Sequence, residues 1–311
     1  MSCENCHRGR AIVLRSENRK RVCKDCFFLL FEEDVHRTIV DTNMFLRGQT
    51  IGVGISGGKD STVLAYVLDK LNKKYNYGVN LQLLCIDEGI AGYRDNSIDT
   101  VIRNSDDLKL KLKILSYDEV FGINMDEVVK KIGKKNNCTY CGVFRRQALE
   151  EAAKKTNCDI IVTGHNADDM AETIVLNLLR GDHSRLIRCT APISQRQRNE
   201  DGTVLSLPRA KPFKYSYQKE IVLYAFHKKL LYFSTECSYS PGAYRGHART
   251  FIKELEKRDS KIITNIIKSG DLLFKQVDSS LNVNPCIKCS HPTSSKDNLC
   301  KACMLLETLK R

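Results

Sequence analysis

The chain lacks any hydrophobic run long enough to cross a membrane. A transmembrane helix needs about 18 or more consecutive apolar residues, and no such stretch occurs among the 311 residues. The first ten residues, MSCENCHRGR, also lack the apolar segment of a secretory signal peptide. We therefore expect no membrane association and a location in the reducing environment of the cytoplasm.

Acidic residues are scarce relative to basic ones. The sequence has 37 Asp and Glu against 50 Lys and Arg, which gives a formal net charge of +13. Such an excess is typical of proteins that bind a polyanion, nucleic acid first and an anionic membrane surface second. Charge that only keeps the protein soluble is the alternative. Hydrophobic residues make up 42% of the chain, so its length allows one sizeable α/β domain with small appendages.

Disulfide bonds are not expected in the cytoplasm, although the sequence contains 14 cysteines. Ten of them form five Cys-x-x-Cys pairs, namely Cys3/Cys6, Cys23/Cys26, Cys138/Cys141, Cys286/Cys289 and Cys300/Cys303. This spacing lets two sulfur atoms bind one metal ion from one tight turn, so metal binding is the first interpretation. Cys85 and Cys158 lie beside apolar predicted strands and are expected to be buried packing residues.

The first two pairs and the last two pairs each predict a zinc ribbon. Sixteen residues separate Cys6 from Cys23, and ten residues separate Cys289 from Cys300. Four thiolates close a tetrahedral site, so both Zn²⁺ ions are expected to be structural. His291 is then a spectator, because the neighbouring thiolates already fill the site. Unliganded thiols are the alternative interpretation of both groups.

The middle of the chain alternates short β-rich runs with longer helical patterns. Strands are predicted at residues 50–55, 81–86, 112–115 and 159–163, and helices are predicted to start at Ser61, Ser97, Val143 and Asp168. This alternation favours a Rossmann-like α/β fold, in which helices cover both faces of a parallel sheet. The polar residues 194–202 predict a loop.

A glycine-rich turn follows the first of these strands. It reads Ser56-Gly57-Gly58-Lys59-Asp60-Ser61 and precedes an apolar-periodic helix. In this context backbone N–H groups converge on an anion, and glycine lets the main chain approach a phosphate closely. The turn is neither a Walker A loop nor a G-x-G-x-x-G motif. An ordinary tight turn between a strand and a helix is the alternative.

The turn resembles the PP-loop of the ATP-pyrophosphatase superfamily, whose members cleave ATP between the α and β phosphates and adenylate a carbonyl oxygen. The resemblance implies that residues 56–61 bind the pyrophosphate of ATP, with Lys59 as a catalytic cation. The superfamily's second region matches residues 163–169, in which Gly164, Asp168 and Asp169 stand. These carboxylates either hold Mg²⁺ or only complement the helix dipole. The resemblance also implies that the backbone of Ile86 contacts adenine, because Ile86 stands at the position that makes this contact in the superfamily.

A third cysteine site comprises Cys138, Cys141 and the distant Cys237. The pair precedes a predicted helix, and a helix N-terminus lowers the pKa of a thiol, so we expect thiolates there. From the residues alone, either a redox-active pair that carries persulfide or a metal site is consistent with the pattern.

The whole chain resembles the tRNA 2-thiouridine synthetases that carry zinc ribbons at both ends, and within them the eukaryotic cytosolic branch. The matching stretches are SGGKDS, CTYCGVFRR, TGHNADDMAET, RCTAP, KPFKYSYQKEIVLYA and YFSTECSYSP. The resemblance implies ribbons at residues 1–30 and 281–311 and a catalytic domain at residues 31–280. It also implies that Cys138, Cys141 and Cys237 hold a [4Fe-4S] cluster through three thiolates and take part in catalysis. A persulfide or disulfide relay is the alternative.

The activity implied by this resemblance is the ATP-dependent 2-thiolation of the wobble uridine of tRNA, by adenylation of the C2 oxygen and transfer of sulfur. The implied partners are tRNA, a ubiquitin-like sulfur-carrier protein and a second, noncatalytic thiolation subunit, and an oligomer is compatible with it. The alternatives are another PP-loop tRNA modifier, such as a cytidine thiolase, and a zinc-bearing tRNA-binding subunit without catalysis.

The segment from Arg180 to Lys229 is a predicted RNA surface, with eleven Lys or Arg against four Asp or Glu. Tyr215 and Tyr217 are interleaved with the basic residues of this segment. These basic residues include Arg180, Arg185, Arg188, Arg196, Arg198, Arg209, Lys211 and Lys214. Cations contact phosphates, and aromatic rings stack on unpaired bases. A solvated basic face and tyrosines that pack in the core are the alternatives.

Overall fold

A computed structural model describes residues 1–133, 136–198, 202–235, 237–239, 245–275 and 283–310. The strands are β1 Val13–Leu14, β2 Arg21–Val22, β3 Thr50–Gly54, β4 Asn80–Asp87, β5 Lys111–Ser116, β6 Ile160–Val162, β7 Gln197–Arg198, β8 Val204–Ser206, β9 Arg209–Ala210, β10 Asn284–Pro285 and β11 Pro292–Thr293. The helices are α1 Lys24–Asp41, α2 Lys59–Tyr75, α3 Arg94–Leu108, α4 Tyr117–Phe121, α5 Met125–Ile132, α6 Asn137–Lys155, α7 Ala167–Leu179, α8 His183–Thr190, α9 Gln218–Lys228, α10 Arg245–Arg258, α11 Ile262–Lys275 and α12 Lys301–Lys310.

A five-stranded parallel sheet forms the centre, in the order β5-β4-β3-β6-β9. The chain builds outward from β3 to β4 and β5, then returns to the other side of β3 with β6 and β9. The order therefore reverses at β3, and ligands of open α/β sheets bind at the carboxyl edge beside such a reversal. The four predicted strands are confirmed. The sequence pattern missed β9, because its two residues are too few to show a period.

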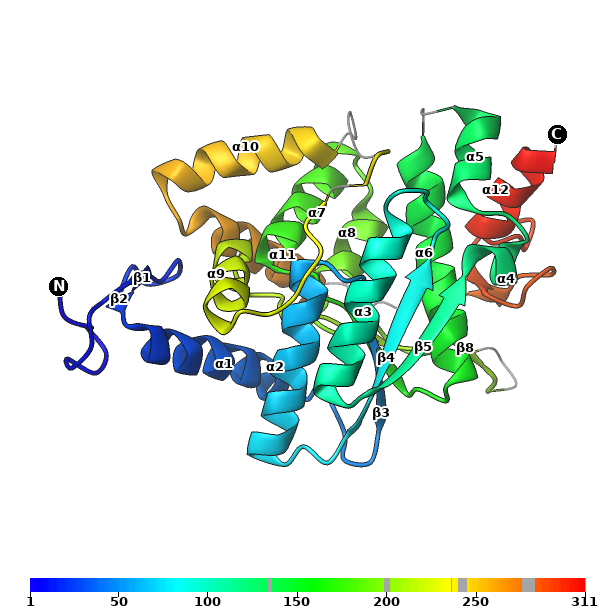
Figure 1. Ribbon diagram of the computed structural model, residues 1–311. Helices are drawn as coiled ribbons and strands as arrows, with labels where there is room; N and C mark the ends of the chain where they lie inside the picture. Colours follow the sequence, from blue (N-terminus) through cyan, green and yellow to red (C-terminus); the bar gives the residue numbers. More distant parts are fainter. Residues whose placement is uncertain (134–135, 199–201, 236, 240–244, 276–282, 311) are drawn as a thin grey trace.

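Helices cover both faces of the sheet, as predicted. Leu83 and Leu84 of β4 are both fully buried, and consecutive strand residues point to opposite faces. Leu83 joins the core formed with α1, α2 and α9, whereas Leu84 packs with Leu149 and Ala152 of α6. Figure 1 shows α2 and α6 on either side of the strands, with the N-terminus and the C-terminus at opposite ends of the molecule.

Predicted helix starts were late by one to six residues. The helices expected at Ser61 and Val143 begin at Lys59 and Asn137. In both helices the first turn is polar or contains cysteines, and the regular spacing of apolar residues begins only after it. The hydrophobic pattern therefore does not reveal the first turn of either helix. Among the helices that the structure describes, none is both long and apolar enough to cross a bilayer.

Candidate functional site

The phosphate loop connects the carboxyl end of β3 to the N-terminus of α2. Gly57 has φ +73°, and a Cβ there would lie 2.7 Å from the carbonyl oxygen of Ser97, so only glycine fits. Ser61 closes the loop: its Oγ accepts the N–H of Ser56 at 3.1 Å and donates to the carbonyl of Gly58 at 3.0 Å. The N-cap of α2 is Gly58. The loop points the first N–H groups of α2 at an anion site.

The second motif packs directly on this loop. A Cβ on Gly164 would lie 3.0 Å from the carbonyl carbon of Asp60, so this glycine permits the close approach. Asn166 donates through Nδ2 to Asp60 Oδ1 at 3.0 Å. The same Asn166 caps α7 in a reciprocal capping box with Asp169. The two motifs, about a hundred residues apart in the sequence, thus form one rigid unit at the reversal point of the sheet.

The two aspartates that open α7 have different environments. The side chain of Asp168 is 4% exposed, and its oxygens accept from Lys253 at 2.5 Å and from the Gln218 N–H at 2.7 Å. The side chain of Asp169 is 27% exposed and pairs with Arg245 at 3.0 Å. Asp168 is therefore held inside the protein by α9 and α10. Both of its partners are protein groups, whereas the sequence analysis considered a metal ion or the helix dipole.

Helix α10 was not predicted from the sequence, and its cations cover this acidic turn. Arg245, Arg249 and Lys253 recur every four residues, so they share one face of α10. Arg245 and Arg249 both pair with the buried Glu172 of α7, and Arg249 does so at 2.9 Å. The i, i+4, i+8 spacing was a signal in the sequence. Its acidic counterpart on α7 had instead been assigned to a metal.

Ile86 lies one position before the end of β4, where the sheet edge opens. The carbonyl of Leu84 accepts the N–H of Ile55 at 2.9 Å, just past the last paired residues of β3 and β4, Gly54 and Leu84. The main-chain groups of Ile86 face the same side as those of Leu84, because strand residues alternate. They point beyond the end of β3, beside the phosphate loop. This position is compatible with the predicted backbone contact to adenine.

The third cysteine site occupies the first turn of α6. Cys138 is exposed and Cys141 is partly buried. Arg145 donates to Cys141 Sγ at 3.5 Å and pairs with Glu88 at 2.7 Å, and the hydroxyl of Tyr117 donates to the Cys141 carbonyl at 2.9 Å. The thiols were expected to be thiolate-prone at this helix terminus. Instead, burial raises the pKa of both Cys138 and Cys141, and the positive charge of Arg145 only partly offsets it.

One short segment links the cysteine site to the phosphate loop. The N–H of Phe233 donates to the Gly57 carbonyl at 2.8 Å. Six residues later the carbonyl of Tyr239 accepts from Asn137 Nδ2 at 3.3 Å and lies 3.9 Å from Cys138 Sγ. Cys237, partly buried, lies between these two anchors. Cys141 and Cys237 pack against the same hydrophobic cluster, and Cys138 Sγ lies against the carbonyl two residues after Cys237, so the three predicted thiols lie in one region of the structure.

Several of the cations predicted to bind RNA are used inside the protein. Lys214 is 1% exposed and pairs with Asp271, and Tyr217 is 2% exposed. Arg209 pairs with Glu150 at 2.8 Å. Lys214 and Tyr217 are therefore structural, and core packing was the correct alternative for that tyrosine. The side chain of Arg188 and residues 199–201 lie outside what the structure describes.

Positive charges from several elements act on His165, which immediately follows Gly164. The His165 ring is exposed, yet desolvation is the main reason that its pKa is lowered to about 4. The positive charges that lower its pKa further are Lys211, Arg245, Arg146 and Arg209. His165 Nδ1 lies 2.7 Å from Thr163 Oγ1, so a neutral imidazole directs Nε2 away from this partner.

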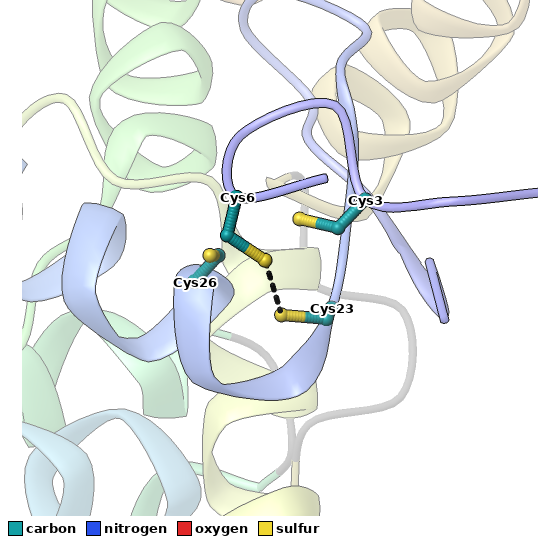
Figure 2. Close-up of side chains that lie close together, drawn as sticks. All are labelled: Cys3, Cys6, Cys23 and Cys26. Carbon is teal, nitrogen blue, oxygen red and sulfur yellow. Dashed lines mark hydrogen bonds between the residues drawn. The ribbon is translucent and has the colours of Figure 1, made fainter. Parts of the chain in front are cut away.

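The terminal cysteine groups have the geometry of single-metal sites. Within each group the four Sγ atoms all lie within 4.8 Å of one another. Figure 2 shows the first group, in which Cys3 and Cys6 come from one turn and Cys23 and Cys26 from the start of α1. Four converging thiols suit a tetrahedral ion. Cys138, Cys141 and Cys237 are not among the described groups with this close spacing.

The fold and the loop define a PP-loop protein, and the family model for the PP-loop domain matches residues 31–255. Relatives named cytoplasmic tRNA 2-thiolation protein 1 are 53% identical in Danio rerio and 52% identical in Laccaria bicolor. The alignments cover 100% of this chain and 89% and 86% of those proteins. The chain therefore belongs to the cytoplasmic tRNA 2-thiolation protein 1 family.

A solved structure extends the similarity to three dimensions. The U34-tRNA thiolase NcsA from Methanococcus maripaludis, determined with its [4Fe-4S] cluster, matches with a TM-score of 0.82 and 26% identity. The match covers 99% of this chain and 96% of that one, so it includes both terminal ribbons as well as the central sheet.

Proposed function

We propose that this chain catalyses the ATP-dependent 2-thiolation of the wobble uridine of tRNA in the cytoplasm. The observation that carries the proposal is the segment from Phe233 to Tyr239, which bonds the phosphate loop at one end and the cysteine site at the other. An adenylating site and a sulfur-handling site are thereby held side by side. The names of the relatives and of the archaeal thiolase support the same reaction.

ATP binds with its pyrophosphate on residues 56–61 and its adenine near the main chain of Ile86. Lys59 lies 3.2 Å from Asp60 and is 30% exposed, so its ammonium can turn toward a phosphate. Mg²⁺ is assigned to Asp60 and Asp169. Burial and the charge of Asp169 raise the pKa of Asp60, and burial also raises the pKa of Asp169. A divalent cation would relieve this repulsion.

The reaction needs activation because the C2 oxygen of uracil is a poor leaving group. That oxygen attacks the α-phosphorus of ATP, pyrophosphate leaves, and the N3 proton is lost. HS⁻ then attacks C2, the C2–O bond breaks, and AMP leaves with the oxygen. The proton of HS⁻ restores the N3–H. Lys59 and the N–H groups of the loop stabilise the negative charge that develops on the phosphates.

The three cysteines are the proposed ligands of a [4Fe-4S] cluster. Cys138 and Cys141 lie in the first turns of α6, Cys141 and Cys237 pack against the same hydrophobic cluster, and the Tyr239 carbonyl lies 3.9 Å from Cys138 Sγ. A cluster with three protein thiolates has one iron open, and this iron can hold sulfide. Arg145 beside Cys141 would balance the negative charge of such a group. The two terminal groups are assigned to structural Zn²⁺.

The surface around His165 is the proposed place of the target nucleotide. It lies between Gly164, which touches the phosphate loop, and Arg146, which follows the residue bonded to Cys141. Arg146 supplies positive charge for phosphate groups. A neutral His165 contacts the base by hydrogen bonding. The sulfur is proposed to come from a ubiquitin-like carrier protein, with a second, noncatalytic subunit as partner.

Mass spectrometry of tRNA nucleosides tests this function, after anaerobic incubation of the iron- and zinc-loaded protein with ATP, sulfide and unmodified tRNA. We expect 2-thiouridine only when ATP is present. Formation of 2-thiocytidine would keep the chemistry and contradict the substrate. Absence of sulfur from every nucleoside would contradict catalysis by this chain alone.

A matched pair of lysine variants tests the role of the loop. Lys59→Ala should abolish thiolation while tRNA binding, measured by filter retention, is retained. Lys73→Ala, on the same helix but 70% exposed and paired only with Asp69 in the next turn back, should leave the rate unchanged. Thiolation that persists in Lys59→Ala would reject the catalytic role of this cation.

A further inference from the structure

The C-terminal cysteine group and the three-cysteine site share one hydrophobic core. Cys286, Cys300 and Cys303 are buried in the same cluster as Tyr140 and Phe144 of α6. Cys141, Cys237 and Cys289 pack against this cluster from its edge. The N-terminal group, by contrast, buries Cys3 and Cys26 in the core around α1, α2 and α9. Only one of the two ribbons is thus continuous with the proposed cluster site.

Hydrogen bonds fix the first turns of α6 to this ribbon. The hydroxyls of Tyr140 and Thr308 lie 2.8 Å apart, and Tyr140 stands between Cys138 and Cys141 in the sequence. Two turns further along α6, Gln147 Nε2 donates to Cys289 Sγ at 3.5 Å. The helix that carries two of the three thiols therefore bonds both a ribbon ligand and α12. Figure 1 shows α12 lying beside α5 and α6.

The N-terminal ribbon has the corresponding bond inside itself. Asn5 Nδ2 donates to Cys26 Sγ at 3.3 Å, and Asn5 lies between the ligands Cys3 and Cys6. Among the described residues, each ribbon therefore has one side-chain amide that donates to one ligand sulfur. In the N-terminal ribbon the donor is local, whereas in the C-terminal ribbon it belongs to the catalytic domain. Such outer contacts orient metal ligands, and their loss lowers metal affinity by about 10–100-fold.

We propose that the metal ion of the C-terminal ribbon positions Cys138 and Cys141 for the iron–sulfur cluster, with Tyr140 and Gln147 as positioning residues. The inference rests on the proposed function, because it takes the three-cysteine site to hold that cluster. The ribbon has strands of only two residues, β10 and β11, and zinc supplies the folding free energy of such small units. Without the zinc ion, the ribbon no longer supports α12, and Tyr140 loses its hydrogen bond to Thr308 of that helix. The thiols on α6 are then no longer held in a binding arrangement.

The test compares one ligand variant in each ribbon. Wild type, Cys300→Ser and Cys23→Ser are reconstituted anaerobically with zinc, iron and sulfide, and zinc, iron and the visible absorption of the cluster are measured per chain. Each variant should lose one zinc. Iron and cluster absorption should fall about tenfold or more in Cys300→Ser and stay at the wild-type level in Cys23→Ser. Equal iron in the two variants would overturn the proposal.

A second pair of variants, which leaves all metal ligands in place, tests the inference if Cys300→Ser fails to fold. Gln147→Leu and Asn5→Leu each remove one amide donor from a ribbon sulfur. The rate of iron loss to a chelator should rise in Gln147→Leu and in Tyr140→Phe, and stay unchanged in Asn5→Leu. Nucleotide binding, which uses residues 56–61 rather than these three side chains, should be normal in all three. Unchanged iron loss in both α6 variants would overturn the positioning role.

Iron binding is measured independently of thiolation activity. Failure of the positioning role can therefore be distinguished from failure of the proposed function. A wild-type protein that binds iron and shows the variant pattern but makes no 2-thiouridine supports the coupling and contradicts the proposed function. One that thiolates tRNA and binds iron equally in all variants contradicts only the coupling. A wild-type protein that retains no iron contradicts both.

Discussion

The two terminal ribbons each have two Cys-x-x-Cys pairs as ligands, yet they are attached to the protein by different contacts. Arg15 of the N-terminal ribbon is 4% exposed and bonds Glu220 of α9 at 3.0 Å and Asp34 of α1 at 2.6 Å. The C-terminal ribbon is held mainly by apolar packing and by hydrogen bonds from Tyr140 and Gln147 of α6, and Lys131 of α5 donates to the Leu309 carbonyl of α12 at 3.1 Å. A four-cysteine spacing therefore predicts a metal, but its neighbours decide what the metal stabilises.

This difference in attachment separates the roles of the two ribbons. The buried charges of the N-terminal ribbon join it to α1 and α9, on the side of the sheet away from the cysteines of α6. The contacts of the C-terminal ribbon end beside Cys141 and Cys237. The first ribbon is expected to affect stability, and the second to affect the chemistry.

The largest expected effect is on the iron content of the protein. This effect distinguishes the three-cysteine site from the two zinc ribbons. Cys237→Ala should lose nearly all iron while two zinc ions per chain are retained, because no ribbon ligand is changed. Elemental analysis after anaerobic reconstitution measures both metals. Cys189→Ala is the matched control, since this partly buried cysteine bonds only Asn177 and a helix carbonyl. Unchanged iron in Cys237→Ala would remove this residue from the ligand set.

Arg15→Ala should give the next largest effect, a loss of stability without a loss of iron. Removal of the arginine leaves Glu220, 3% exposed, without its charge partner, and breaking a buried pair costs about 3–5 kcal/mol. Urea denaturation followed by circular dichroism measures it. Arg8→Ala, on the exposed face of the same ribbon, should change the free energy of unfolding by less than about 0.5 kcal/mol.

The double variant Arg15→Leu/Glu220→Leu sharpens the interpretation. Replacement of both charges by apolar side chains should recover much of the lost stability, because the unpaired carboxylate is gone. A double variant as unstable as Arg15→Ala would show that the charge of Glu220 is not the cause.

Much of the site was predictable from the sequence because it lies in local motifs. The phosphate loop is a run of six residues, and each Cys-x-x-Cys pair is a single turn, so spacing alone indicates the chemistry. The four strands of the central sheet other than β9 also follow from apolar runs. These features depend on neighbours in the chain rather than on tertiary contacts.

The parts that were missed depend on tertiary contacts. The burial of Asp168 by Lys253 and Gln218, and of Lys214 by Asp271, involves residues 50 or more positions apart. Likewise, a helix N-terminus predicts thiolates at Cys138 and Cys141, but desolvation outweighs it. A sequence shows which residues carry charge, but only the packing shows whether that charge faces solvent, a partner or a ligand.

A smaller effect is expected in the rates at which the two ribbons release metal. Cys6 and Cys23 are partly exposed in the first ribbon, whereas Cys289 is the partly exposed ligand of the second. The N-terminal zinc should therefore be lost several-fold faster to a chromogenic chelator. Cys23→Ser should remove the fast phase and Cys300→Ser the slow phase. A single phase in the wild type would mean that ligand exposure does not control release.

The smallest expected effect comes from the one charge pair within the C-terminal ribbon and its helix α12 that the structure describes, Lys288 with Glu307. The two side chains are 51% and 41% exposed, and exposed pairs contribute about 0–1 kcal/mol. Lys288→Ala should change the free energy of unfolding by no more than this, and the change should vanish in high salt. Zinc and iron contents should stay at the wild-type level. A cost comparable to that of Arg15→Ala would show that charge also anchors the C-terminal ribbon, and the contrast between the two ribbons would not hold.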